Sequence, residues 1–487
     1  MSTVSGEVTV EEELASIPLV VRKQLSKLLE ELDQRARLHR TLDSYYVGDT
    51  PIPDAIVQAK VTRAYRNLMP VSTAPWGSLV VDSTQDRLEP SGISSEERST
   101  DKLVWGLWQD NQMDAEWQIA QNATLVDGRS FAIVWRPPGS SVPEVSLDNS
   151  ATVAVLYREG SRRHRVAAVR RWVDEDGRTA VNLYTPDFVW KFIKPMNGNE
   201  GQSSGRVHAA GVWWERREDD PEWPLQNPWG VVPVVEIPIN RRLKQGVFPP
   251  VRGDFAHCLG LIDRIHLLTF LGLVVAFWMG FPLRGIIGEK ILRDDDNNVI
   301  PPFDANAAGL AQLEDPAAKI FEYKAADRKN LSVMEELDQF SSITKTPRHY
   351  FPLEKGMSNL SAEAIMATEG ALHAKVSSYK KSVGEGGEEV LRLLGLMSDE
   401  EVVLSPRAEL HWMNHESRSL AEAADAATKW ASIGIPIPVI ADKCLNFSAE
   451  EISKLEAQML NDPLSKLVVD AAKKRPAAEE EPEPVAA

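Results

Sequence analysis

Residues 346–358 read TPRHYFPLEKGMS and separate two stretches that both have helical periodicity. Apolar residues recur at helical spacing over 331–340 before this run and over 365–383 after it. Proline removes a backbone donor and disfavours helix in the residue before it, so the first helix must end at the start of the run. Asn359 or Ser361 can cap the second helix. The pattern predicts two helices joined by a basic, aromatic loop that projects sideways.

The totals indicate an ordinary globular chain of two to four domains, with 487 residues, 43% of them hydrophobic and 26% charged. The formal net charge is −17, from 71 acidic and 54 basic side chains. Proteins that hold nucleic acid by broad phosphate neutralisation are rich in Lys and Arg, so that class is disfavoured. A protein through which nucleic acid passes without being bound tightly remains compatible with this charge.

The compartment signals favour an intracellular protein. Cys258 and Cys444 are the two cysteines and lie far apart in the chain, as expected in a reducing environment. Met1 to Leu14 carries four Glu and no basic residue, which is unlike a secretory signal. We therefore expect the protein in the cytoplasm, or in an assembly formed there.

The first half of the chain changes period from helix to strand near Asp127. Helical patterns cover residues 18–46, 78–88, 96–110 and 114–126. Short runs of β-branched and aromatic residues then predict an antiparallel meander, with Asp176-Gly177 as a hairpin turn. The predicted strands are residues 130–136, 152–158, 166–173, 179–184 and 188–192, and 231–239 can add another.

Residues 253–280 predict a third long helix, and 267–283 hold 17 residues without a charge. A buried core helix, a membrane span and a packed ring interface all fit such a run. A membrane span needs about 20 apolar residues and suitable basic flanks, which disfavours that alternative. Gly272, Ala276 and Gly280 lie four apart, so one face is small enough for another helix to approach closely.

The second half adds smaller elements. A compact insert with a short strand at residues 319–323 follows the apolar helix, and residues 402–412 predict another strand. Helices are expected over 419–432 and 448–459, the latter headed by a capping box at Ser448. From about Lys473 the acidic, proline-containing tail should be disordered.

No motif for catalysis or nucleotide binding is present. The sequence contains no GxxxxGK[ST] phosphate loop, no GxSxG elbow and no HExxH pair. Gly384 to Gly387 lacks the phosphate-binding lysine and lies inside a helical pattern, where it predicts a kink and weakens helix continuity. We therefore expect no enzyme and no cofactor.

No set of residues makes a convincing metal site. Asp294 to Asn298 resembles a calcium loop but lacks its required Gly and Glu. His411 and His415, with Glu416, are the best candidate ligands, but their strand-like surroundings disfavour a shared site. His257 and His266 would point to opposite sides of one helix. We expect no bound metal.

The order of these elements resembles the portal proteins of tailed double-stranded DNA phages. The likeness includes the apolar helix that ends in Phe281-Pro282 and the helix broken at residues 346–358. Three short segments also carry it, namely YYVGD at 45–49, WGSLVVD at 76–82 and NLSAEA at 359–364. The resemblance covers residues 20 to 465. It implies a mainly helical α+β fold built from wing, stem, clip and crown regions, assembling as a ring that usually has twelve subunits.

The resemblance also implies how the chain is divided. The expected regions are a flexible N-terminus at 1–17, a wing at 18–252, a first stem helix at 253–280, a clip at 281–330, a second stem helix at 331–345, a tunnel loop at 346–358, a long wing helix and strand at 359–416, crown helices at 417–470 and a disordered acidic tail at 471–487.

The function implied is a channel at one capsid vertex of the virion, assembled in the host cytoplasm, through which DNA is packaged and later ejected. Implied partners are further copies of the chain, the terminase large subunit, head-completion proteins, capsid and scaffolding proteins, and transiently held duplex DNA, with no membrane. An acidic channel with a few cationic points would avoid tight DNA binding. The candidates for these points are Lys345, Arg348, His349 and Lys355, and Gly272, Ala276 and Gly280 would pack stem helices around the ring.

Three other classes stay open on sequence grounds. The uncharged run at 267–283 also fits a membrane-associated oligomeric channel protein. Another head-tail structural protein and an unrecognised hydrolase are the remaining alternatives. Solubility without detergent separates a portal from the membrane-associated channel protein. A hydrolase would need a cluster of titratable groups.

Overall fold

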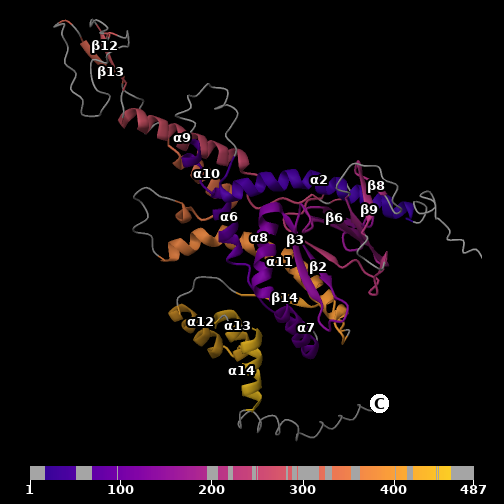
Figure 1. Ribbon diagram of the computed structural model, residues 1–487. Helices are drawn as coiled ribbons and strands as arrows, with labels where there is room; N and C mark the ends of the chain where they lie inside the picture. The colour runs from indigo at the N-terminus through magenta and orange to yellow at the C-terminus, as the bar shows by residue number, and fades with distance from the viewer. Residues whose placement is uncertain are drawn as a thin grey trace, which may run out of the picture. The chain divides into compact units, whose positions relative to one another are not determined.

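The computed structural model describes residues 17–50, 68–95, 97–194, 207–217, 223–243, 248, 250–280, 283–287, 293, 295, 317, 319–323, 332–351, 362–400, 402–413, 420–445, 447 and 449–461. These residues divide between two compact units (Figure 1). Unit 1 contains residues 1–36, 83–251 and 373–487, and unit 2 contains residues 37–82 and 252–372. The chain passes between them within helices α2 (Leu19–Val47), α6 (Trp76–Gln85) and α11 (Ala362–Met397).

Unit 1 is built on a seven-stranded antiparallel sheet in the order β4-β5-β6-β7-β9-β8, with β10 paired to β7. The strands β4 to β7 form the predicted meander, and Gly177 turns the chain between β5 and β6 with φ +76°. The bounds are β4 (Val153–Tyr157), β5 (Arg165–Val173), β6 (Thr179–Tyr184), β7 (Phe188–Ile193), β8 (Val207–Ala209), β9 (Val212–Arg216) and β10 (Leu225–Gln226).

A second sheet corrects the predicted topology. Strand β2 (Arg129–Trp135) does not join the meander but lies between β3 (Glu144–Asn149) and β11 (Val234–Pro238). Its residues are buried almost throughout, as befits a central strand whose faces are both covered. The predicted strand at 231–239 exists as β11, and it pairs with β2.

The two sheets and a helix form layers. On one face of the seven-stranded sheet, the first turns of α2 bury Leu25, Leu28, Leu29 and Leu32 against residues such as Phe192. On the other face, residues of β2 and β11 pack against β4, β5, β6 and β7. Burying a leucine side chain contributes about 1.5–3 kcal/mol, so this amphipathic face explains why α2 is stable as a helix.

Helices complete unit 1. Helix α7 (Arg98–Asp110) packs on α8 (Met113–Asp127), where the rings of Trp108 and Trp117 meet at 5.1 Å between centroids. Helix α8 also packs on β2 and β3. The chain ends in α12 (Leu420–Ser432), α13 (Ile437–Leu445) and α14 (Ala449–Asn461), of which α13 was not predicted.

Two expectations about the chain after residue 380 need correction. Helix α11 runs without interruption through Gly384 to Gly387, so the loss of helix continuity expected there is not found. A Cβ on Gly386 would lie 2.9 Å from Ile237 of β11, so these glycines allow a close approach. The strand predicted at 402–412 is limited to β14 (Glu409–Trp412), paired with β1 (Pro90–Ser94), because Pro406 lies in a turn that ends at Ala408.

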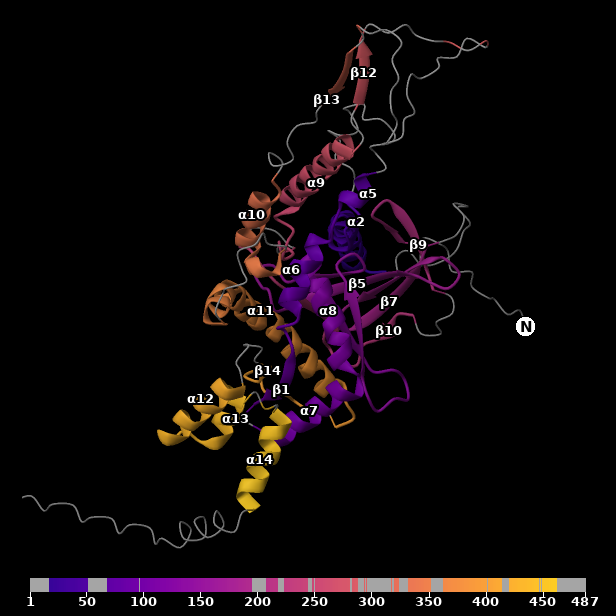
Figure 2. The same ribbon diagram turned by 90° about the vertical axis from the view of Figure 1, so that its left-hand side faces the viewer.

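Unit 2 is organised around helix α9 (Leu259–Gly280), flanked by α5 (Met69–Ser72) and α10 (Met334–Thr344) (Figure 2). The helix starts six residues later than predicted, because residues 254–258 form a turn in which the Cys258 N–H donates to Phe255. Phe255 is fully buried beneath Gly77. Strands β12 (Leu283–Ile287) and β13 (Lys319–Tyr323) form a hairpin, which confirms the predicted short strand.

Several sequence predictions fall on residues that the structure does not describe. These are the expectations for residues 1–14, the caps at Asn359, Ser361 and Ser448, most of the calcium-like loop, His415 and the acidic tail.

Candidate functional site

The interruption predicted between two helices at residues 346–358 lies in unit 2, between α10 and α11. Helix α10 ends at Thr344, and Lys345 follows it in the left-handed region with φ +56°. The hydroxyl of Ser341 donates to the carbonyl of Thr346 at 2.8 Å, and the Thr346 N–H returns a bond to Ser341 at 3.1 Å. These paired bonds stop the helix at the predicted place and fix the start of the loop.

A single turn of 3₁₀ helix follows the proline. It covers Arg348–Tyr350 and begins after Pro347, whose φ of −56° suits the entry to a turn. Phe351 then inserts its ring between Phe340 and Trp76, at 5.9 Å from each ring centre, and is 4% exposed. Phe351 therefore anchors the predicted loop by its buried ring. Arg348 and His349 lie in the turn just before this anchor.

Arg348 and His349 of the turn have partners within unit 2. The Nε of Arg348 lies 2.8 Å from Oδ1 of Asp338, which is six residues before the end of α10. Arg348 is exposed and Asp338 is partly exposed. His349 lies 3.5 Å from a carboxylate oxygen of Glu369 on α11, which is buried. That same oxygen accepts a bond from the Tyr350 hydroxyl at 3.2 Å. The turn is thus tied to both neighbouring helices by acidic side chains.

The four predicted DNA-facing residues therefore differ in their surroundings. Lys345 is exposed on a strained backbone, and Arg348 is exposed but ion-paired. His349 is half-buried, between Glu369 and the hydroxyl of Thr368, which lies 3.3 Å from its Nδ1. Lys355 lies outside the described residues.

The predicted small face of α9 is only partly exposed, and the side that packs on α5 is the opposite one. Gly272 is buried and Ala276 is half-buried, while nothing is described for the surroundings of Gly280 beyond its place in the helix. Phe270 and Val274 contribute to a small core with Met69 of α5. Large apolar side chains are exposed elsewhere on the helix, including Leu271 and Met279 at 38% and 61%.

Helix α9 is one helix, among the described residues, that is long and apolar enough to cross a membrane, over Leu259–Phe277. Only 28% of that apolar window is buried within the chain. A core helix of a soluble protein would be mostly buried, whereas the described residues leave much of this apolar surface uncovered.

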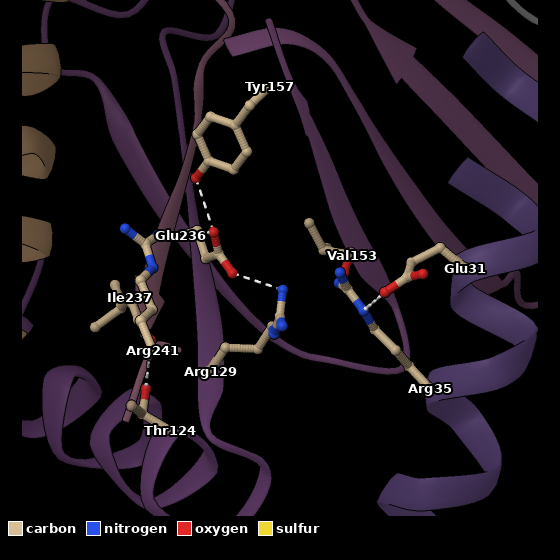
Figure 3. Close-up of polar contacts among 9 residues, drawn as sticks. All are labelled: Glu31, Arg35, Thr124, Arg129, Val153, Tyr157, Glu236, Ile237 and Arg241. Atoms are coloured by element: carbon tan, nitrogen blue, oxygen red, sulfur yellow. Dashed lines mark hydrogen bonds and ion pairs between the residues drawn. The ribbon is translucent and has the colours of Figure 1, made fainter. Parts of the chain in front are cut away.

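Unit 1 holds a second polar cluster, centred on the buried carboxylate of Glu236 (Figure 3). Arg129 and Arg241 lie 2.7 Å and 2.9 Å from its two oxygens, and the Tyr157 hydroxyl donates to it at 2.8 Å. Burial alone would raise the pKa of Glu236, but the guanidinium groups of Arg129, Arg241 and Arg35 hold it below its ordinary value. Both carboxylate oxygens of Glu236 are therefore engaged by side chains of unit 1.

Arg35 completes this cluster from helix α2. It pairs with Glu31 at 2.7 Å, and its guanidinium lies over the rings of Phe131 and Phe248. Burial and the neighbouring Arg129 lower the pKa of Arg35 to about 10. The cluster thus joins α2 to both sheets of unit 1.

The described residues contain no group of His, Cys, Asp and Glu side chains able to hold a metal. His266 is buried in α9, contacts Thr50 and the backbone of Ala74, and has its pKa lowered by burial. His411 bonds to Ser94 across β1 and β14, at 2.7 Å. Neither Cys258 nor Cys444 forms a disulfide.

Sequence reasoning missed the acidic partners of the loop and the whole Glu236 cluster. Glu236 and Arg129 are 107 residues apart, so no local pattern connects them. Asp338 is only ten residues before Arg348, and an acidic residue in the helix that precedes the loop was a signal that could have been used.

Comparison with known proteins identifies the family. The family model "Phage portal protein, SPP1 Gp6-like" matches residues 25–459. Proteins named "Portal protein" from Mycobacterium phages D29 and L5 are 27% and 28% identical over 447 and 439 residues. The aligned part is 86% of this chain and 83% of the D29 protein, and 85% of this chain and 82% of the L5 protein.

Among solved structures, the chain is similar to one in the neck of a native GTA particle computed with C12 symmetry. The sequences are 12% identical, the TM-score is 0.40, and the match covers 78% of this chain and 92% of the other. The corresponding match in the neck of an empty GTA particle computed with C6 symmetry has 11% identity, a TM-score of 0.41, and covers 77% and 90%. Because the family model spans most of the sequence, this chain belongs to the SPP1 Gp6-like family of phage portal proteins.

Proposed function

We propose that this portal protein assembles with further copies of itself, twelve in the simplest case, into a ring at one vertex of the capsid. Double-stranded DNA would enter the capsid through the central channel during packaging and leave through it during ejection. The role is mechanical and requires no catalytic group of this chain.

The exposed apolar surface of α9 carries this proposal. A chain of net charge −17 displays a helix whose apolar window is only 28% buried. In a ring, α9 of each subunit would be covered by its neighbours, which removes that surface from water. Arg264 of α9 pairs with Glu336 of α10, so the two helices would act together as the stem.

The other regions follow from the family. Residues 18–252 and 359–416 would form the wing, residues around β12 and β13 the clip, and α12, α13 and α14 the crown. The clip would meet the terminase large subunit during packaging and head-completion proteins afterwards. Capsid and scaffolding proteins would meet the ring as it assembles in the host cytoplasm.

The loop between α10 and α11 would face DNA in transit. Lys345, Arg348, His349 and Lys355 are its proposed contacts, and their number is small because every phosphate neutralised adds affinity and resists movement. The pairing of Arg348 with Asp338 supports a weak contact, since that cation is already partly compensated.

Negative-stain electron microscopy of the full chain, purified without detergent, tests the proposal. We expect soluble rings with a central hole. Monomers alone at concentrations used for assembly would contradict the proposal, and a requirement for detergent would favour the membrane-associated channel.

A further inference from the structure

A basic hairpin lies between β4 and β5 in unit 1. Residues 158–164 read REGSRRH, which places three arginines and one glutamate in seven residues of a chain whose net charge is −17. Arg158, Arg162, Arg163 and His164 are all exposed. We call residues 158–164 the arginine hairpin.

The backbone of the arginine hairpin is fixed without help from its arginine side chains. The Arg158 N–H donates to the carbonyl of His164 at 2.9 Å, and the Ser161 N–H donates to the carbonyl of Arg158 at 2.9 Å. The Ser161 hydroxyl oxygen accepts bonds from the N–H groups of Arg163 and His164, both at 3.2 Å. Gly160, with φ +75°, supplies the left-handed residue that the turn needs.

The cations of the hairpin differ from the arginines that follow it. Arg165, Arg170, Arg171 and Arg178 each meet a carboxylate, at distances from 2.6 to 3.0 Å. Within the part of the chain that the structure describes, no side chain pairs with the guanidinium groups of Arg158, Arg162 and Arg163. Arg165, at the base of the hairpin, pairs with Glu389 of α11, which ties the base of the hairpin to that helix.

The residue types of the hairpin favour a phosphate backbone over a protein surface. Protein docking sites depend on buried aromatic or aliphatic anchors, and residues 158–164 contain none. Phosphate contacts need only cations and hydrogen-bond donors, and the planar guanidinium group matches phosphate in two-pronged geometry. Without aromatic residues to stack on bases, such a contact would not depend on sequence.

We propose that the arginine hairpin is a contact for the phosphate backbone of duplex DNA, separate from the loop at residues 345–355. The proposal does not rest on ring formation, because the hairpin is complete within one subunit. Arg158, Arg162 and Arg163 would each meet a phosphate and release counterions from the duplex.

Fluorescence anisotropy of a short labelled duplex of arbitrary sequence, titrated with the full chain, tests this contact. The variant Arg158→Gln/Arg162→Gln/Arg163→Gln should bind about 10- to 100-fold more weakly at low salt, because three phosphate contacts are lost. The slope of log affinity against log salt should become shallower by about 2–3, measured from about 50 to 200 mM salt. Its melting temperature should not change, because these side chains have no partners within the described structure.

Two further variants serve as controls. Arg136→Gln/Arg171→Gln/Arg178→Gln removes the same charge from arginines that are paired with carboxylates, and should weaken binding much less. Lys345→Gln/Arg348→Gln reports on the loop in unit 2. Equal loss in both triple variants would reduce the effect to net charge and overturn the proposal. Unchanged DNA binding by the hairpin variant would also overturn the proposal, and so would a loss of binding confined to the loop variant. A hairpin variant that binds DNA normally but fails to bind a capsid or scaffolding protein would overturn it as well.

Discussion

At the scale of single residues, Glu236 is a buried carboxylate that pairs with two arginines of unit 1. Its side chain is 1% exposed and compensates both Arg129 and Arg241. The variant Glu236→Gln keeps the shape but leaves those guanidinium groups without a counter-charge, which should lower the free energy of unfolding by about 3–5 kcal/mol. Urea denaturation measures this change.

Asp176→Asn is the matched control for that variant. It also removes a carboxylate from an arginine pair, but Asp176 is 69% exposed and should cost at most about 1 kcal/mol. Equal losses for the two variants would contradict the importance assigned to the buried cluster.

The same carboxylate predicts how stability depends on pH. Because the folded-state pKa of Glu236 lies below its ordinary value, the folded protein favours the ionised form. The stabilisation is present above the unfolded-state pKa of about 4.3 and is lost as the pH falls from there through the folded-state pKa. Denaturation midpoints measured between neutral and acidic pH should fall over this range for the wild type, and fall less steeply for Glu236→Gln.

Lys345 combines an exposed charge with a backbone conformation that favours glycine. Replacing it in Lys345→Gly should raise the free energy of unfolding by about 0.5–1 kcal/mol, because glycine tolerates the left-handed region at a helix end. If the charge meets DNA, the same variant should package DNA less efficiently in vitro despite its greater stability. Lys345→Arg retains the charge on the same backbone and should package normally. Normal packaging by Lys345→Gly would remove Lys345 from the proposed contacts.

At the scale of elements, α11 explains why glycines occur inside a long helix. A Cβ at Gly386 would lie 2.9 Å from Ile237, and one at Gly387 would lie 3.0 Å from Leu410. At Gly395 a Cβ would collide with the carbonyl oxygen of Val402. Glycine lowers the helix propensity at these positions, but the absence of a Cβ lets α11 pack closely on β11 and β14.

Alanine substitutions within α11 test this explanation. Gly386→Ala should destabilise the protein by about 1–3 kcal/mol through overpacking, even though alanine is the better helix former. Gly370→Ala, on the same helix with nothing within 4 Å of its Cβ position, should stabilise it by about 0.5–1 kcal/mol. Thermal denaturation compares the two, and stabilisation by both would show that the contact with Ile237 can relax without cost.

Elements were predictable to different degrees for a physical reason. Helices α2, α7, α8 and α12 follow from apolar spacing within one segment, and their ends lie within about two residues of the predicted ones. The start of α9 was predicted too early, because the apolar Phe255 was assigned to the helix. Phe255 instead belongs to the preceding turn, and its ring packs beneath Gly77. Strands β2 and β11 were correctly located but assigned to the wrong sheet, because pairing depends on partners about 100 residues away.

At the scale of the whole molecule, the small residues of α9 bear on assembly. If neighbouring stem helices approach at Ala276, then Ala276→Phe should impede ring formation, because overpacking costs about 1–3 kcal/mol at each interface around the ring. Ala276→Ser keeps the side chain small and should form rings. Electron microscopy counts the rings, and thermal denaturation establishes that the subunits are folded. Normal rings from Ala276→Phe would contradict a close helix contact at this position.

The sequence by itself determined the order and type of most elements, the break at residues 346–358 and the family. These properties depend on local periodicity, on proline and on short motifs in a fixed order, all of which are present in the linear chain. It also indicated which charged residues the loop carries.

Only the tertiary structure decided which of those charges have partners. Arg348 and His349 proved to be held by Asp338 and Glu369, while Arg158, Arg162 and Arg163 are exposed and have no pairing partner among the described residues. A sequence states the charge of a side chain, but its electrostatic environment depends on groups brought close by folding, often from distant segments. For the same reason, the Glu236 cluster and the close packing of Gly386 became visible only in three dimensions.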